Sequence, residues 1–201
     1  MRNRSVTPFR YFILYKPFGI LCQFTDKEGK PTIAGLGDFP ADVYSAGRLD
    51  ADSEGLVLLT NDGRLKYALL NPQFRHPRLY LVQVERAPTQ DAMEKLRRGI
   101  VLHGKKTMPA KVRLLKKEPS VPPRPVPIRY RKNVPTAWME MVLYEGRNRQ
   151  VRKMTAAVGH PTLRLIRTRI GQLTLEGLQP GEYRELTMKE MEDLRELVLA
   201  R

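Results

Sequence analysis

The chain has 201 residues and is 41% hydrophobic, which is long and apolar enough for a folded protein of one or two domains with a buried core. Its 36 Lys and Arg residues against 21 Asp and Glu residues leave a formal charge of +15, so we expect a polyanionic partner: RNA, DNA or an anionic membrane surface. The single cysteine, Cys22, excludes an internal disulfide and a zinc site of the Cys/His kind.

The first residues are basic but lack the apolar core of a signal peptide, so we expect residues 1–8 to be a flexible basic tail. No run of about eighteen apolar residues follows, which predicts a cytoplasmic protein without a membrane-spanning segment. Residues 9–201 should form a single domain, with a tentative division into two lobes near residue 80.

Runs rich in β-branched and aromatic residues, several of them alternating, predict strands at residues 11–15, 43–46, 56–60, 80–85, 110–117, 136–144 and 163–170. Apolar residues at helical spacing predict helices at residues 63–70, 90–98, 148–158 and 185–201. Thr89 and Gly99 are suited to begin and end the second helix, and Asn148 to begin the third. Because strands and helices do not alternate regularly, the fold class is α+β, with a mixed, mainly antiparallel sheet and flanking helices.

The segment from Pro119 to Pro135 contains six prolines and four basic residues, too many breaks for a regular element. We expect an exposed loop or arm. It is either a plain connector or a basic segment that contacts RNA, and the sequence leaves both readings open.

Three carboxylates, Asp50, Asp52 and Glu54, are concentrated between the strands at 43–46 and 56–60. They match the start of an EF-hand calcium loop, but the twelfth position is Asn61 instead of Glu, and strands flank the loop where an EF-hand has helices. Asp52 and Glu54 are the better candidates for a solvated acidic turn. Asp50, at the end of an apolar stretch, is the better candidate for a carboxylate that points into a cleft. A hydrolase with paired carboxylates is disfavoured, because Asp50 and Asp52 on an extended chain would point to opposite sides.

Three segments in order carry a resemblance to a known family: residues 47–56, with the sequence GRLDADSEGL, then residues 78–82, and then residues 145–154, EGRNRQVRKM, followed by Gly159–Pro161. They resemble the signature of the pseudouridine synthases of the RsuA group, which modify ribosomal RNA. The resemblance covers most of the chain, from about residue 11 to residue 171. It implies a catalytic fold of two lobes, roughly 9–80 and 81–201, around a basic cleft.

The family reaction detaches uracil at N1 from its ribose and reattaches it through C5, on a nucleotide flipped out of the RNA. By resemblance Asp50 is the catalytic aspartate, and whether it attacks the sugar, attacks the base or removes a sugar proton stays open. Arg152 would pair with Asp50 and keep it ionised. Tyr80 would stack on the target uracil, and Arg48 would hold the gap left in the RNA.

The remaining expected substrate contacts lie in the second half of the chain. Leu163 and Leu165 resemble an apolar pocket wall of related enzymes, and which of them faces the base stays open. Arg147, Arg149 and Lys153 are expected to bind phosphate, and Arg167 lies on a strand with a cationic side.

The resemblance implies no metal and no organic cofactor, and a ribosomal RNA substrate, most simply the 23S rRNA. Many members of the group carry an N-terminal RNA-binding module of the S4 type. Only about ten residues precede the first strand here, so we expect none, and we expect a monomer. The main alternative is a non-catalytic basic protein that binds ribosomal RNA. Such a protein would tolerate Asp50→Asn, whereas an enzyme would lose turnover and keep binding.

Overall fold

The computed structural model describes residues 8–128 and 134–199, so the tail predicted at 1–8 lies outside it except for Pro8, as does the middle of the proline-rich segment. The strands are β1 (Tyr11–Lys16), β2 (Tyr44–Ser45), β3 (Glu54–Thr60), β4 (Arg78–Glu85), β5 (Val101–Leu102), β6 (Lys105–Lys106), β7 (Lys111–Leu114), β8 (Thr136–Leu143), β9 (Thr162–Ile170), β10 (Leu173–Thr174) and β11 (Tyr183–Glu185). The helices are α1 (Gly63–Leu70), α2 (Gln90–Arg98), α3 (Gln150–Ala157) and α4 (Met188–Leu199), with short 3-10 turns η1 (Ile33–Leu36) and η2 (Pro72–Phe74).

Nine of these strands form one sheet, in the order β11-β1-β3-β9-β4-β8-β7, with β2 paired to β3 and β10 to β9. Within the described chain, β3 and β9 run parallel and the other pairs in this sheet are antiparallel. β5 and β6 form a separate hairpin. The mixed, mainly antiparallel α+β fold predicted from the sequence is confirmed.

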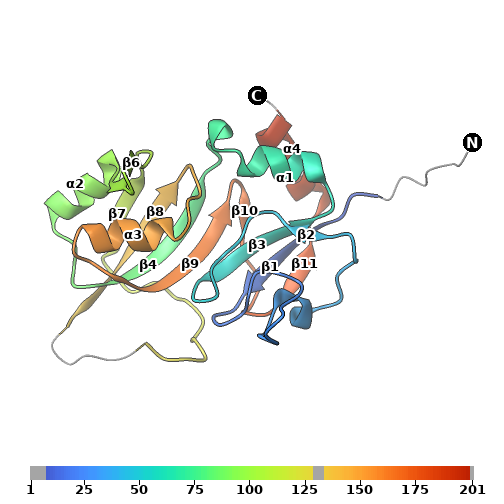
Figure 1. Ribbon diagram of the computed structural model, residues 1–201, viewed down its shortest axis with the longest axis horizontal. Helices are drawn as coiled ribbons and strands as arrows, with labels where there is room; N and C mark the ends of the chain where they lie inside the picture. The colour runs from blue at the N-terminus through green and yellow to red at the C-terminus, as the bar shows by residue number, and fades with distance from the viewer. Residues whose placement is uncertain (1–7, 129–133, 200–201) are drawn as a thin grey trace, which may run out of the picture.

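The molecule has two halves, which share the sheet and meet where β3 and β9 lie side by side (Figure 1). One half holds β11, β1, β3 and β2 with α1 and α4, and the other holds β9, β4, β8 and β7 with α2 and α3. The C-terminal β11 and α4 therefore return to the half that contains the start of the chain. A division of the sequence at residue 80 does not follow the division in space.

Local sequence explains the helices that were predicted at their observed bounds. The Asp62 side chain accepts a hydrogen bond from the Leu65 amide at 3.0 Å and begins α1. The Thr89 side chain accepts one from the Ala92 amide at 3.2 Å and begins α2, which ends at Gly99. These are capping contacts between residues three apart, so they depend on little beyond the helix itself.

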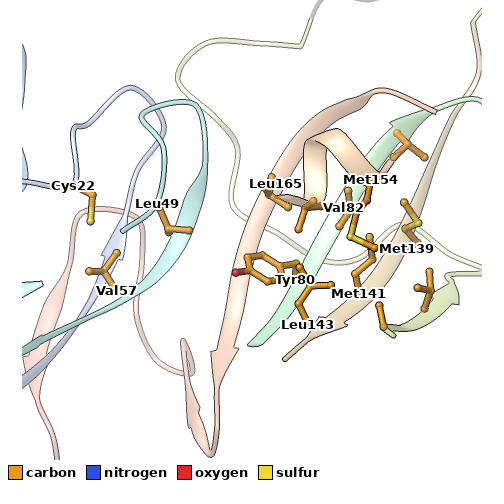
Figure 2. Packing of buried hydrophobic residues seen from close by; sticks show 14 of the residues in the cluster. Cys22, Leu49, Val57, Tyr80, Val82, Met139, Met141, Leu143, Met154 and Leu165 are labelled. Atoms are coloured by element: carbon orange, nitrogen blue, oxygen red, sulfur yellow. The ribbon is translucent and has the colours of Figure 1, made fainter. Parts of the chain in front are cut away.

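Two hydrophobic clusters cover the two faces of the sheet. In the first, α2 and α3 pack on β4 and β8, and residues 20–43 pack on β1 and β3; Figure 2 shows part of it. In the second, α1 and α4 pack against β1 and β3. Both clusters run across the sheet, so apolar contacts join the two halves beside the β3–β9 junction.

The junction of the halves is narrow, with Glu54 opposite Ile166 and Gly55 opposite Arg167. Gly55 has φ +109°, and a Cβ atom on it would lie 2.2 Å from the Arg167 carbonyl oxygen. Only glycine permits this conformation and this close approach. The acidic loop before β3 is thereby brought to the meeting point of the halves.

The structure differs from the sequence predictions at several element ends. α3 begins at Gln150, after Arg149 in a left-handed conformation at φ 51°, and Asn148 does not cap it but accepts a hydrogen bond from Lys153 instead. Residues 183–185, partly placed in the terminal helix, form β11, which pairs with β1. No helix of the described residues is both long and apolar enough to cross a membrane.

Candidate active site

The acidic loop, residues 47–53, is anchored from behind by a buried lysine. Ser53 donates its amide to the Asp50 carbonyl at 3.0 Å, which folds residues 50–53 into a turn. The Lys16 side chain is fully buried, and its Nζ donates to the carbonyls of Pro17 at 2.8 Å, Ile20 at 2.7 Å and Ala51 at 3.4 Å. Burial lowers the pKa of Lys16 to about 8. Lys16 therefore ties the end of β1 to the turn that carries Asp50.

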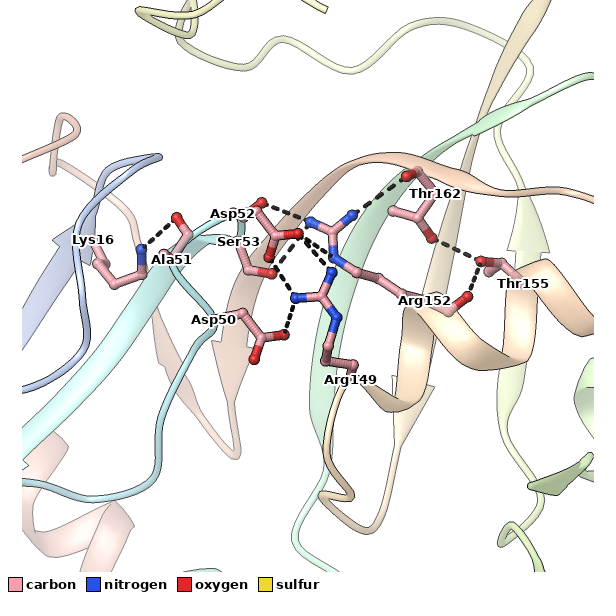
Figure 3. A network of polar contacts seen from close by, with 9 residues as sticks. All are labelled: Lys16, Asp50, Ala51, Asp52, Ser53, Arg149, Arg152, Thr155 and Thr162. Carbon is pink, nitrogen blue, oxygen red and sulfur yellow. Dashed lines mark hydrogen bonds and ion pairs between the residues drawn. The ribbon is translucent and has the colours of Figure 1, made fainter. Parts of the chain in front are cut away.

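Two arginines from the start of α3 hold the front of the same turn (Figure 3). Arg149 bonds both carboxylate oxygens of Asp52, at 3.0 and 2.7 Å, and lies 3.4 Å from Asp50 Oδ2. Arg152 donates to the Asp52 carbonyl at 2.6 Å and to Ser53 Oγ at 3.4 Å, and its Nε lies 3.4 Å from Asp52 Oδ2. The two arginines thus connect the two halves of the molecule through this turn.

The ion pairs differ from those expected from the sequence. The expected partner of Asp50 was Arg152, but the structure pairs Asp50 with Arg149 and Arg152 with Asp52. The turn is the reason, because it brings both carboxylates to the same side, within reach of one guanidinium. The expectation that Asp50 and Asp52 point to opposite sides was therefore wrong, since it assumed an extended chain.

The pKa of Asp52 does not suit a general acid. Burial alone would raise the pKa of Asp52, but hydrogen bonds from Arg149 and the charges of Arg152 and Arg149 outweigh burial and hold it below its ordinary value. A hydrolase with paired carboxylates needs one acid whose pKa is raised. Asp52 therefore does not fit the role of that acid.

Glu54 was expected in a solvated turn, but it is 2% exposed and forms a two-point ion pair with Arg164, at 2.8 and 2.7 Å. Arg164 also donates to the Pro122 carbonyl at 2.8 Å, which fixes the described start of the proline-rich segment to the sheet. Asp50, Asp52 and Glu54 are thus each paired with an arginine, and strands flank this part of the chain. Both observations oppose the calcium-loop alternative.

A pocket of about 410 Å³ opens between the halves, in front of the turn. Its charged lining comprises five arginines and two carboxylates: Arg48, Arg78, Arg147, Arg149, Arg167, Asp50 and Glu145. The cleft expected to be basic is therefore present, and its volume lies within the range of small-ligand sites.

Tyr80 and Leu165 belong to the apolar part of the pocket lining, together with leucines from both halves such as Leu49 and Leu143. Tyr80 is 8% exposed, and its hydroxyl points toward the half that carries Leu49 and Val57 (Figure 2). Leu165 lies opposite Val82 in the β4–β9 pairing. Of the two leucines expected to form a pocket wall, Leu165 lines the pocket and Leu163 does not.

The pocket brings together most of the predicted site residues, namely Arg48, Asp50, Tyr80, Arg147, Arg149, Leu165 and Arg167. Arg152 and Lys153 lie outside its lining. Arg152 contacts the turn through the Asp52 carbonyl, and its Nη1 also donates to the Thr162 carbonyl at the start of β9, at 3.3 Å. Lys153 donates to Asn148 at 3.2 Å.

Arg147 was expected to bind phosphate, but the structure commits its guanidinium to the protein. Its Nε bonds Glu145 at 2.9 Å, and its two Nη atoms donate to the carbonyls of Lys105 and Lys106 at 3.1 and 2.6 Å. Arg147 therefore secures the β5–β6 hairpin at the rim of the pocket.

Sequence reasoning missed four polar residues that build the site: Lys16, Arg78, Glu145 and Gln150. Glu145 is 5% exposed and accepts hydrogen bonds from Arg147, from the Met108 amide at 2.8 Å and from Gln150 Nε2 at 2.8 Å. For Glu145 and Gln150, the signal available in the sequence was the run of closely spaced polar residues that leads into α3. The separate signal for Lys16 was a lysine next to a wholly apolar strand.

Comparisons with known proteins show the family of this chain. A family profile described as RNA pseudouridylate synthase matches residues 10–157. The chain is 47% identical over 189 residues to ribosomal large subunit pseudouridine synthase E of Vibrio vulnificus, covering 93% of this chain and 79% of that protein. It is 52% identical over 170 residues to the protein of the same name from Xanthomonas axonopodis pv. citri, covering 84% and 89%.

A solved structure titled "Crystal structure of pseudouridylate synthase" superposes with a TM-score of 0.78 at 33% identity, covering 94% of this chain and 75% of that one. The resemblance drawn from the three sequence motifs is confirmed by both kinds of comparison. The chain belongs to the RNA pseudouridylate synthase family and is an RNA pseudouridine synthase.

Proposed function

We propose that this protein converts a uridine of ribosomal RNA to pseudouridine, and that its substrate is the 23S rRNA of the large subunit. The names of the Vibrio and Xanthomonas relatives, each a ribosomal large subunit pseudouridine synthase E, support the choice of RNA. The observation that carries the proposal is that Asp50 and Tyr80, from different halves of the molecule, line one pocket rich in arginine.

In this proposal the target nucleotide leaves its RNA helix and enters the pocket, where uracil stacks on Tyr80 against Leu165. Asp50 acts at the ribose or the base while the C1′–N1 bond breaks. A bond then forms between C1′ and C5, the C5 proton leaves to water, and N1 gains a proton. Atoms are conserved, so the reaction is an isomerisation without an oxidant or a second substrate.

The positive residues around the pocket have distinct proposed tasks. Arg48 is exposed at the pocket rim and occupies the place of the flipped nucleotide. Arg149, 41% exposed at its side chain, and Lys153 contact phosphates. Arg152 holds Asp52 and thereby sets the position of Asp50.

The proposed substrate is tested with unmodified transcripts of 23S and 16S rRNA, as free RNA and as reconstituted particles. New pseudouridines are mapped by carbodiimide labelling and reverse-transcription stops. We expect one new site, in 23S rRNA. A site in 16S rRNA alone would contradict the large-subunit assignment, and no site in any sample would contradict the ribosomal substrate.

We also propose that the protein acts as a monomer in the cytoplasm, where ribosomal RNA is modified. The exposed large hydrophobic side chains each belong to a different segment: Phe9, Tyr44, Tyr67, Val101, Leu114, Val126 and Met188. Single exposed apolar residues on separate elements are normal in a monomeric protein. Light scattering of the purified protein measures the mass directly.

A further inference from the structure

Two buried arginines, Arg78 and Arg167, line the pocket without a carboxylate partner in the part of the chain that the structure describes. They are 6% and 4% exposed. Within residues 8–128 and 134–199, no Asp or Glu side chain forms an ion pair with either, although neighbouring Arg149, Arg152 and Arg164 are all paired. Buried charges in proteins are ordinarily paired, so these two call for an explanation.

Each guanidinium uses only a small part of its hydrogen-bonding capacity. Arg78 Nη2 donates to the Leu69 carbonyl at 2.9 Å, and Arg167 Nε donates to the Leu56 carbonyl at 2.8 Å. Arg167 Nη2 is shielded from solvent and has no partner among the described residues. A buried donor without an acceptor is unfavourable, and a ligand that supplies an acceptor removes that penalty.

The two cations lie close enough to influence each other. Burial is the main cause that lowers the pKa of Arg78; Tyr80 opposes this effect, and the positive charge of Arg167 adds to it. Two adjacent buried cations favour a ligand atom that is rich in electrons. This pair of arginines in the pocket lining therefore suits an acceptor that becomes negative.

Strand geometry places both arginines beside the proposed base-stacking residue. Tyr80 is opposite Arg167 in the β4–β9 pairing, and Arg78 precedes Tyr80 by two residues. The β4–β9 register shifts between Leu79 and Tyr80, and Arg78, Tyr80, Leu165 and Arg167 all line the same pocket. A base stacked on Tyr80 would turn one edge toward the arginines.

We propose that Arg167, with Arg78 beside it, binds a carbonyl oxygen of the target uracil, O2 or O4, and stabilises the negative charge that this base takes up during the reaction. This inference rests on the proposed function and adds a binding subsite to it. Arg167 then contacts the substrate, and Arg78 reinforces the positive potential at the same edge.

The chemistry needs such a group whichever route Asp50 takes. If the C1′–N1 bond breaks first, its electron pair stays with the ring and is shared by O2 and O4. If Asp50 adds to the base at C6, the electron pair moves to O4. A donor held in place before the reaction stabilises either anion, and a guanidinium donates a charge-assisted hydrogen bond.

The test uses a synthetic rRNA fragment that contains the mapped uridine, either unmodified or with a single sulfur replacing O2 or O4. Sulfur is a weaker hydrogen-bond acceptor than oxygen. Single-turnover rates and RNA dissociation constants are measured for the wild type, Arg167→Met and Arg167→Lys. Arg169→Met is the matched control, because Arg169 is exposed on the same strand and lines a cavity other than this pocket.

We expect Arg167→Met to slow the single-turnover rate at least 100-fold while the RNA dissociation constant changes less than threefold, and Arg169→Met to change neither by more than twofold. One of the two sulfur substitutions should slow the wild type and have no further effect on Arg167→Met. If Arg167→Met does not fold, the same comparison is made with Arg167→Lys, which keeps a cation. Sulfur effects that are equal in the wild type and the variant would overturn the subsite, whereas an inactive wild type would overturn the proposed substrate.

Discussion

At the residue scale, individual charged side chains position the turn of residues 50–53 that carries Asp50. Asp50 is held in front by Arg149, and the backbone behind it is held by Lys16 through the Ala51 carbonyl. Asp52 takes most of the arginine contacts, which leaves Asp50 with the single longer contact of 3.4 Å. The weaker contact is consistent with the proposal that Asp50 turns to the substrate.

Lys16 predicts a specific pH dependence of stability. Its folded-state pKa of about 8 lies below the ordinary value of 10.5, so between these values the unfolded chain binds more protons than the folded one. The burial penalty is therefore present below pH 8 and is relieved as the pH rises toward 10.5. The free energy of unfolding of the wild type should rise relative to Lys16→Met by up to ~1.4 kcal/mol per pH unit.

Urea unfolding of both proteins from pH 7 to pH 10 measures this difference. Tyrosine ionisation is common to both proteins and cancels in the comparison. Parallel stability curves would show that Lys16 does not titrate in this range.

Single residues were predicted from the sequence where a motif identified them. Asp50, Tyr80 and Leu165 could be found in this way, and they line the pocket. The pairing of Asp50 with Arg149 could not, because it depends on a turn whose hydrogen bond from Ser53 to Asp50 is not apparent in the residue types. The burial of Glu54 was missed because its partner, Arg164, is 110 residues away.

At the scale of elements, the contact between β3 and β9 determines where the two halves meet. Gly55→Ala should lower the free energy of unfolding by at least ~2 kcal/mol, because the new Cβ would lie 2.2 Å from the Arg167 carbonyl oxygen, in a backbone conformation with φ +109°. Thermal or urea unfolding measures the loss.

Gly63→Ala is the matched control, since its Cβ meets nothing within 4 Å and the position is at the start of α1. Alanine favours a helix, so this variant should be as stable as the wild type or slightly more stable. Equal stability of the two variants would contradict the tight β3–β9 contact.

Helices with local caps were the elements best predicted from the sequence. α1 and α2 begin and end where predicted because Asp62, Thr89 and Gly99 act within one turn. The two-residue strands β5, β6 and β10 were missed because so short a run has no periodicity, and β11 because it depends on pairing with β1. The start of α3 was misplaced because Arg149 adopts φ 51° without a side-chain cap.

At the scale of the whole molecule, the net charge of +15 and the pocket between the halves account for a polyanionic substrate. The acidic C-terminal helix α4 packs with α1 in one half, where Glu190 forms a two-point ion pair with Arg184 at 2.7 Å for both contacts. The overall charge was predictable from composition. The concentration of five arginines around one pocket was not, because they come from distant parts of the sequence.

Tritium release from ribosomal RNA labelled at C5 of uridine tests the role of Asp50 most directly, compared for the wild type, Asp50→Asn and the exposed-carboxylate control Asp38→Asn. We expect release by the wild type and by Asp38→Asn, and none above background by Asp50→Asn. Asp50→Asn should still bind the RNA as tightly as the wild type or more tightly, because a negative charge near phosphate is removed. Release by Asp50→Asn at the wild-type rate would contradict the central claim that Asp50 carries the chemistry.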